Sequence, residues 1–270
     1  MQETLWPNQV VAQSIFSVAT GYIKRGGFDW TCNPYLGCTF GCLYCYAMFT
    51  PQNRRPQEDW GKWFQAKINA VELARKHGRK LAGQAVYIST VTDPYMPTEH
   101  SLCLTRGILE ALVPHQPRVV IQTRGPLVVR DIDVLSQFRA LRVNVSIPTD
   151  SEEVRVAFEP KAPPLEKRWE ALAELKASGL KVGICVTPML PLAQPEAFAE
   201  RLVKFAPDVL VTQGFHDGGG QFEANTGEAA RRLLAERRWT DDDYRRVVEL
   251  LRQHLQVYEG EAGFFPPPAV

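Results

Sequence analysis

Apolar runs alternate with helical patterns along most of the chain, and this alternation constrains the fold more than any other feature. The apolar runs predict strands at 29–35, 85–91, 119–124, 142–148, 181–187 and 208–213. Helical patterns fall between them, at 60–77, 105–114, 130–139, 164–178 and 195–205. Neighbouring parallel strands need a long return connection, which a helix supplies. The order of elements therefore predicts an α/β domain built on a parallel sheet.

The alternation is compatible with two architectures, a partial (β/α)6 barrel and a doubly wound open sheet. Periodicity alone does not separate them. We expect the barrel, with a core at residues 29–215 and an N-terminal extension at residues 1–28.

Residues 216–270 have a different pattern and predict a C-terminal loop and helical extension packed on the core. A glycine-rich loop, His216 to Gly220, precedes a charged helix from Asp241 to about Val257. Thr240 is the expected N-cap of that helix. The FFPPP segment near the end predicts an irregular tail.

Charge and hydropathy limit the partners. The chain has 31 Lys and Arg against 30 Asp and Glu, so its net charge of +1 gives no general attraction to nucleic acid or to an anionic membrane. No apolar run has the length of a secretory signal or of a bilayer span. A cytoplasmic protein without a membrane partner is expected.

Three of the six cysteines lie within eight residues, which indicates a metal site and not a disulfide scaffold. The segment NPYLGCTFGCLYCYA places Cys38, Cys42 and Cys45 in a CxxxCxxC array. Cysteine thiolates are the usual ligands of a four-iron cubane. Three cysteines leave one iron open to an outside ligand, as a reactive site requires.

A closed structural zinc site, completed by Cys32 or a distant histidine, is the alternative for this array. The interleaved aromatics Phe40, Tyr44 and Tyr46 argue against it, because they exclude water and offer a flat surface to a planar base. They are also compatible with ordinary packing.

The CxxxCxYC segment, with Tyr44 between the last two cysteines, resembles the signature of the radical S-adenosylmethionine superfamily. More of the chain resembles one branch, the spore photoproduct lyase-like proteins often labelled DNA repair photolyases. The resemblance spans about residues 31 to 192 and includes NPYLGC, TDPYMPTE at 92–99, LTRGILEAL at 104–112, LVVRDIDVL at 127–135 and EPKAPPLEKRWEALAEL at 159–175.

The resemblance implies two cofactors, a 4Fe-4S cluster and S-adenosylmethionine. In this family the methionine group of S-adenosylmethionine chelates the open iron, and reductive cleavage gives a 5′-deoxyadenosyl radical that abstracts hydrogen from a substrate. It also implies an electron donor such as flavodoxin or ferredoxin. The substrate is not identified by the sequence.

Four residues are candidates for contacts to S-adenosylmethionine by analogy with the branch: Tyr44, Thr92, Arg124 and Ser146. Arg124 would pair with the cofactor carboxylate. The branch often carries lysine where Arg124 stands, which keeps the charge but changes the geometry. The alternative is an arginine that bridges to a loop acid.

The TDPYMPTE segment carries Asp93, Tyr95 and Glu99 just after the 85–91 strand. It predicts either a polar set at the substrate mouth or a rigid loop in which Asp93 caps a turn and Glu99 is solvated.

Cys185 is the candidate catalytic residue. In the related lyase a cysteine near the end of the second strand returns hydrogen to the substrate radical, whereas the corresponding stretch here offers Ser89, Thr90 and Thr92. Gly183, Cys185 and other alternate residues of the 181–187 strand share one face, which brings a different thiol towards the lumen. A packed barrel cysteine is the alternative. We therefore expect no spore photoproduct repair.

The sequence is compatible with three functions. The first is a radical enzyme with an unidentified substrate, the second a lyase-like nucleic-acid repair or modification enzyme, and the third a non-catalytic iron-sulfur or zinc protein. The polar strand ends supply a second cofactor pocket, which favours catalysis over electron transfer. Basic groups at Arg54-Arg55, Arg75 to Lys80 and Arg237-Arg238 read as solvated faces, so nucleic acid is not favoured.

Overall fold

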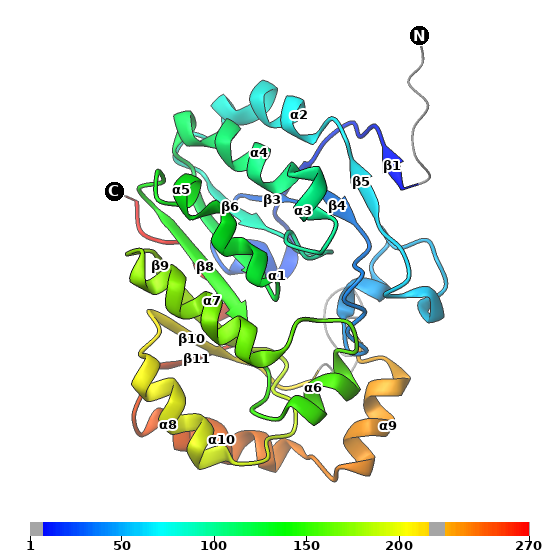
Figure 1. The fold of residues 1–270 in the computed structure, drawn as a ribbon, viewed down its shortest axis with the longest axis vertical. Helices are drawn as coiled ribbons and strands as arrows, with labels where there is room; N and C mark the ends of the chain where they lie inside the picture. Colours follow the sequence, from blue (N-terminus) through cyan, green and yellow to red (C-terminus); the bar gives the residue numbers. More distant parts are fainter. Residues whose placement is uncertain (1–7, 216–224, 270) are drawn as a thin grey trace.

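The main sheet of the protein has eight strands and is open (Figure 1). The computed structural model describes residues 8–215 and 225–269; the predicted loop His216 to Gly220 lies outside them. The strands of the main sheet are β2 Phe16–Val18, β3 Trp30–Cys32, β6 Ala85–Ile88, β7 Arg118–Thr123, β8 Leu141–Ser146, β9 Lys181–Val186, β10 Val209–Thr212 and β11 Val257–Glu259. A separate small sheet contains β1 Gln9–Val10, β4 Tyr35–Leu36 and β5 Gln65–Lys67.

Strand order settles the architecture. The sheet runs β11-β10-β9-β8-β7-β6-β3-β2, so consecutive strands are neighbours and the order never reverses. A doubly wound sheet requires such a reversal. Each neighbouring pair is parallel except β2 with β3, which is antiparallel. The predicted α/β fold with a partial barrel-type winding is confirmed.

Helices cover one face of this sheet, where the largest core lies. Alternate strand residues point into that core; among them, Val86, Ile121, Val143 and Ile184 are fully buried. The helices are α1 Gly21–Arg25, α2 Ala70–His77, α3 Glu99–Leu102, α4 Leu104–Leu112, α5 Ile132–Leu135, α6 Glu152–Phe158, α7 Leu165–Ala177, α8 Pro195–Phe205, α9 Glu228–Glu236 and α10 Asp241–Arg252.

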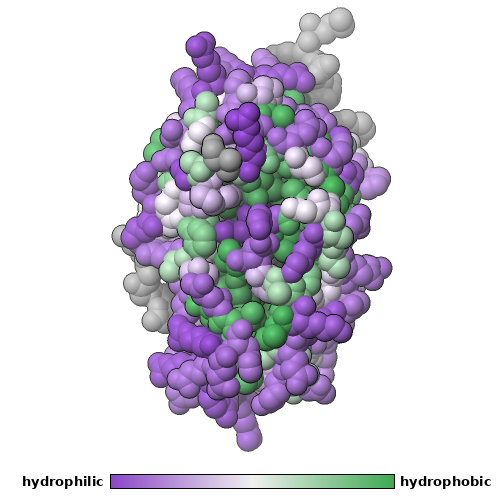
Figure 2. All heavy atoms as spheres, turned by 90° about the vertical axis from the view of Figure 1, so that its left-hand side faces the viewer, coloured by the Kyte–Doolittle hydropathy of each residue, from purple (hydrophilic) through white to green (hydrophobic). Residues whose placement is uncertain are grey.

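The inner face of the sheet has its own apolar layer. Tyr87, Val120, Cys185 and Val211 pack there, and Phe264 from the C-terminal segment packs against them. The tail predicted as irregular thus contributes to the core. Figure 2 shows the side of the molecule near the C terminus, where hydrophobic residues gather in the middle of a polar rim.

Three predicted helices have different bounds. The pattern at 130–139 yields an α-helix only at Ile132–Leu135, because Pro126–Asp131 form a 3-10 helix before it. The pattern at 60–77 yields a helix only from Ala70, because Gly61 adopts a left-handed φ of +85° and residues 65–67 form β5. The C-terminal helix has the predicted Thr240 cap, in a full capping box with Asp243, but ends at Arg252. Among the described helices, none is long and apolar enough to cross a membrane.

Candidate functional site

The three clustered cysteines lie on one loop at the carboxyl end of β3. We call residues 37–46 the cysteine loop. Cys38 and Cys42 are 8% and 5% exposed, and Cys45 is half-buried. On the right-hand side of Figure 1 this loop joins β4 to the segment that leads to β5. Since the carboxyl ends of parallel strands meet at one edge, the loop faces the ends of β6, β7 and β8.

Glycines allow the cysteine loop to pack closely on the segment that follows it. Gly37 and Gly41 have φ values of +75° and +63°. A Cβ atom on Gly37 would lie 2.7 Å from the ring of Trp63, and one on Gly61 would lie 2.6 Å from Cα of Gly41. Only glycine fits at these contacts, so the loop path depends on these residues.

The three thiols lie within electrostatic range of one another. Burial raises the pKa of Cys38 well above its usual range, and Asp93, Cys42 and Cys45 raise it further. Burial also raises the pKa of Cys42 to about 12, with Glu159 and Cys45 adding to the effect while Arg124 opposes it. Such thiols favour a cationic partner, because a bound metal compensates the thiolate charge.

The donor chemistry of this loop fits a cluster with three protein ligands. Within the described residues, no group of three or more His, Cys, Asp or Glu side chains is arranged to hold a metal ion. A cubane takes each thiolate at a separate iron, so its ligands surround a cluster and not one ion. Cys32 packs under the helices, in a different cluster from Cys38 and Cys42, and does not complete a zinc site.

Aromatic side chains cover the loop, as predicted. Tyr44 is 5% exposed and its ring lies edge-on to Phe215, with centroids 6.1 Å apart. Phe158 packs on Phe215 in turn, at 6.3 Å. Phe40 is 2% exposed, whereas Tyr46 is 39% exposed. These rings keep water from the buried thiols.

Two anchors tie the end of β6 to the cysteine loop and to β7. The Thr92 hydroxyl donates to the carbonyl of Gly37 at 2.5 Å. The Asp93 carboxylate accepts hydrogen bonds from the Thr123 hydroxyl at 2.7 Å and from the Arg124 amide at 2.8 Å. Asp93 also accepts from the Tyr95 amide, as a turn-capping residue does. Asp93 therefore places Arg124 beside the loop.

Arg124 bridges to a loop acid, which is the alternative that the sequence left open. Its Nε donates to Oε1 of Glu159 at 2.7 Å, and its Nη2 donates to the hydroxyl of Tyr44 at 2.9 Å. Nη1 has no hydrogen bond to any described residue, and the side chain is 18% exposed. One edge of the guanidinium is thus held by protein and the other stays available.

Glu159 is the site residue that the sequence analysis missed. It follows α6, is fully buried, and contacts Arg124, Arg168 and the hydroxyl of Tyr44. The EPKAPP segment is part of the family resemblance, but a single glutamate in a loop has no sequence pattern that marks it as buried.

Ser146 and Cys185 both hydrogen-bond to Gln122, on the inner face of the sheet. The Gln122 amide donates to the Ser146 hydroxyl at 2.8 Å, and its carbonyl oxygen accepts from the Cys185 thiol at 3.3 Å. Cys185 is fully buried, and this burial raises its pKa to about 12. It is therefore a neutral thiol at physiological pH.

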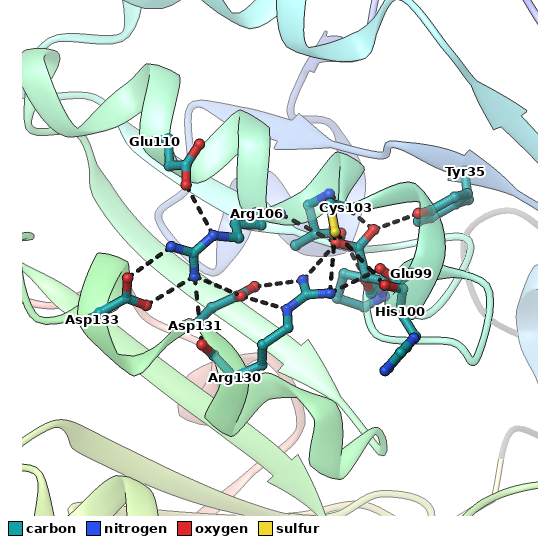
Figure 3. Close-up of polar contacts among 11 residues, drawn as sticks. Tyr35, Glu99, His100, Cys103, Arg106, Glu110, Arg130, Asp131 and Asp133 are labelled. Atoms are coloured by element: carbon teal, nitrogen blue, oxygen red, sulfur yellow. Dashed lines mark hydrogen bonds and ion pairs between the residues drawn. The ribbon is translucent and has the colours of Figure 1, made fainter.

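The prediction of a solvated Glu99 is wrong. Glu99 is fully buried; its carboxylate accepts from the hydroxyl of Tyr35 and pairs with Arg130 at 2.9 Å. Figure 3 shows that Arg130 and Arg106 share Asp131 and extend the network to Asp133. Glu99 joins α3 to β4 through Tyr35 and to the 3-10 segment Pro126–Asp131 through Arg130, and none of its hydrogen bonds within the described residues goes to the clustered cysteines.

Comparisons with known proteins agree with this geometry. The model of the radical SAM superfamily matches residues 32–206. An uncharacterized protein of Acidianus two-tailed virus is 32% identical over 75% of this chain and 74% of its own length. One of Methanocaldococcus jannaschii is 32% identical over 62% of this chain and 63% of its own length.

A solved structure has the same fold. A spore photoproduct lyase variant with bound AdoMet and dinucleoside spore photoproduct superposes with a TM-score of 0.61 and 16% identity, over 93% of this chain and 81% of the lyase.

Proposed function

Because the chain belongs to the radical SAM superfamily, whose enzymes use a 4Fe-4S cluster and S-adenosylmethionine, we propose that Cys38, Cys42 and Cys45 hold that cluster. The three buried cysteines on one loop carry the proposal. With both cofactors bound, the chemistry supplied is reductive cleavage of S-adenosylmethionine and hydrogen abstraction by a 5′-deoxyadenosyl radical.

The residues around the loop bind and orient S-adenosylmethionine in this proposal. Arg124 offers its Nη1 edge to the cofactor carboxylate, since Glu159 and Tyr44 already hold the other edge. Thr92 and Ser146 lie at the ends of β6 and β8 and contribute hydroxyl groups. Tyr44 contributes an aromatic wall that excludes water.

Cys185 is proposed as the hydrogen donor to the substrate radical. Burial keeps it a protonated thiol, the form that gives up a hydrogen atom, and Gln122 links it to Ser146. The substrate class stays open. The proposed reductant is a small carrier protein such as flavodoxin or ferredoxin. We also propose a cytoplasmic location, since all six cysteines are free of disulfide bonds.

Iron analysis tests the ligand assignment. Anaerobically reconstituted wild-type protein is expected to bind about four iron and four sulfide per chain. Single Cys→Ala changes at Cys38, Cys42 and Cys45 each remove one ligand and should abolish stable loading. Cys103→Ser is the control, because Cys103 is exposed and lies outside the loop. A single air-stable zinc without iron uptake would refute the assignment.

A further inference from the structure

Glu159 connects three parts of the candidate site. Its Oε1 accepts from Arg124 at 2.7 Å and from the Tyr44 hydroxyl, and its Oε2 accepts from Arg168 at 2.5 Å. Arg168 lies in α7 and is fully buried, and its Nη1 donates to the carbonyl of Ser146 at 3.0 Å. One carboxylate therefore links the cysteine loop, the end of β7 and the end of β8.

The backbone makes a second connection at the same place. The amide of Leu43, between Cys42 and Tyr44, donates to the carbonyl of Phe158 at 2.9 Å. Glu159 is the next residue, and its Oε1 lies 4.0 Å from the Cys42 sulfur. The end of α6 thus supports the cysteine loop through both backbone and side chain.

The single negative charge of Glu159 lies between two positive charges, those of Arg124 and Arg168. The fully buried carboxylate accepts from two guanidinium groups, from Arg124 at 2.7 Å and from Arg168 at 2.5 Å. The carboxylate is therefore ionised and faces two guanidinium groups. Without Glu159, the guanidinium groups of Arg124 and Arg168 would lose the carboxylate that pairs with both of them next to Cys42.

Glu99 provides an internal comparison. It is also fully buried and also contacts a tyrosine and an arginine, Tyr35 and Arg130 (Figure 3). The hydrogen-bond partners of the Glu99 carboxylate are Tyr35, Arg130 and the amides of Thr105 and Arg106, whereas Oε1 of Glu159 lies 4.0 Å from the Cys42 sulfur. The two glutamates share their chemistry but not their distance from the candidate cluster.

We propose that Glu159 is a positioning residue of the cofactor site: it fixes Tyr44 and Arg124, and its negative charge keeps the reduction potential of the cluster low. This inference rests on the proposed function, because it assumes that Cys42 is a cluster ligand. The net charge around an iron-sulfur cluster is one of the factors that set its potential. A negative charge nearby disfavours the added electron.

A potentiometric titration followed by electron paramagnetic resonance tests the inference on four reconstituted proteins: wild type, Glu159→Gln, Glu159→Asp and Glu99→Gln. Glu159→Gln keeps the side-chain size and removes the charge, so the midpoint potential should become more positive. Glu159→Asp keeps the charge and should stay close to wild type. Glu99→Gln imposes a comparable loss in a buried network and should leave the potential unchanged.

The outcomes separate the two claims. Unchanged potential in a loaded Glu159→Gln protein, or an equal shift in Glu99→Gln, would overturn the inference and leave the proposed function standing. A wild-type protein that takes up no iron would contradict the proposed function itself.

Glu159→Gln leaves a buried charge unpaired, which is strongly destabilising. If this variant does not fold, two further variants, which lack the Arg168 charge, replace it. Arg168→Gln alone and Arg168→Gln with Glu159→Gln then differ only in the charge at residue 159. The double variant should have the more positive potential, and equal potentials would overturn the inference.

Discussion

Arg124 is held by the protein along one edge of its guanidinium group, and we propose that S-adenosylmethionine binds the other edge. Its Nε and Nη2 are held by Glu159 and Tyr44, so the guanidinium is oriented before anything binds. Preorganisation of this kind lowers the entropy that a ligand loses on binding. The Asp93 carboxylate accepts a hydrogen bond from the Arg124 amide and so also fixes the backbone of Arg124.

We predict that Arg124→Ala weakens S-adenosylmethionine binding while the iron content stays at the wild-type level. A lost charge-assisted hydrogen bond of about 1.5–3 kcal/mol corresponds to roughly 10- to 100-fold in dissociation constant. Equilibrium binding to the reconstituted protein measures this. Arg130→Ala is the matched control, because Arg130 pairs with buried Glu99 away from the loop. Wild-type affinity in Arg124→Ala would place Arg124 outside the cofactor site.

Residues with a pattern were predictable, and isolated residues were not. The spacing of Cys38, Cys42 and Cys45 identified them as a group. Glu159 and Glu99 are single acids in polar segments, and such acids are usually solvated. Their burial depends on arginines far away in sequence, Arg124 for the first and Arg130 for the second. No local pattern contains that information.

At the scale of elements, strand alternation was the most informative signal. It predicted that Cys185 lies on the lumen side of its strand, and Cys185 packs on the inner face of the sheet with Val120 and Val211. Helix patterns were less reliable where glycine intervened. The 60–77 pattern contains Gly61, whose left-handed backbone packs against Gly41, so tertiary contact overrode periodicity there.

The position of the thiol on the inner face of the sheet leads to a prediction about the substrate. The residues after β6 include Ser89, Thr90 and Thr92 but no cysteine, and the inner-face thiol is Cys185 on β9. We predict that reduced enzyme with S-adenosylmethionine does not repair an oligonucleotide carrying spore photoproduct. An alcohol is a poorer hydrogen-atom donor than a thiol, and Cys185 stands on a different strand.

Chromatographic analysis of the oligonucleotide decides this prediction. Restoration of two thymines over multiple turnovers would contradict it. Loss of that repair in Cys185→Ala would then identify Cys185 as the donor for this lesion.

At the scale of the whole molecule, segments from both ends of the chain complete the sheet. β2 pairs with β3 at one edge, and β11 pairs with β10 at the other. Phe264 then packs on Tyr22 and Tyr87, with ring centroids 5.9 and 6.2 Å apart. The amino end of α9 also lies close to the cysteine loop, since a Cβ on Gly227 would approach the Leu43 carbonyl at 2.5 Å.

These terminal contributions were the least predictable part of the fold. The short β11 and the burial of Phe264 depend on contacts with strands far away in sequence, and a FFPPP segment alone indicates only the absence of regular structure. The central alternation needed no such information, because each βα unit is local.

We propose that the cysteine loop, Arg124 and the strand ends together form a site for reductive cleavage of S-adenosylmethionine. The most direct measurement is the yield of 5′-deoxyadenosine from dithionite-reduced, reconstituted wild-type protein, quantified by liquid chromatography. We predict slow formation of 5′-deoxyadenosine and methionine even without substrate, and none from the Cys42→Ala protein. A protein that carries four iron and four sulfide per chain, binds S-adenosylmethionine and yields no 5′-deoxyadenosine on reduction would contradict the account.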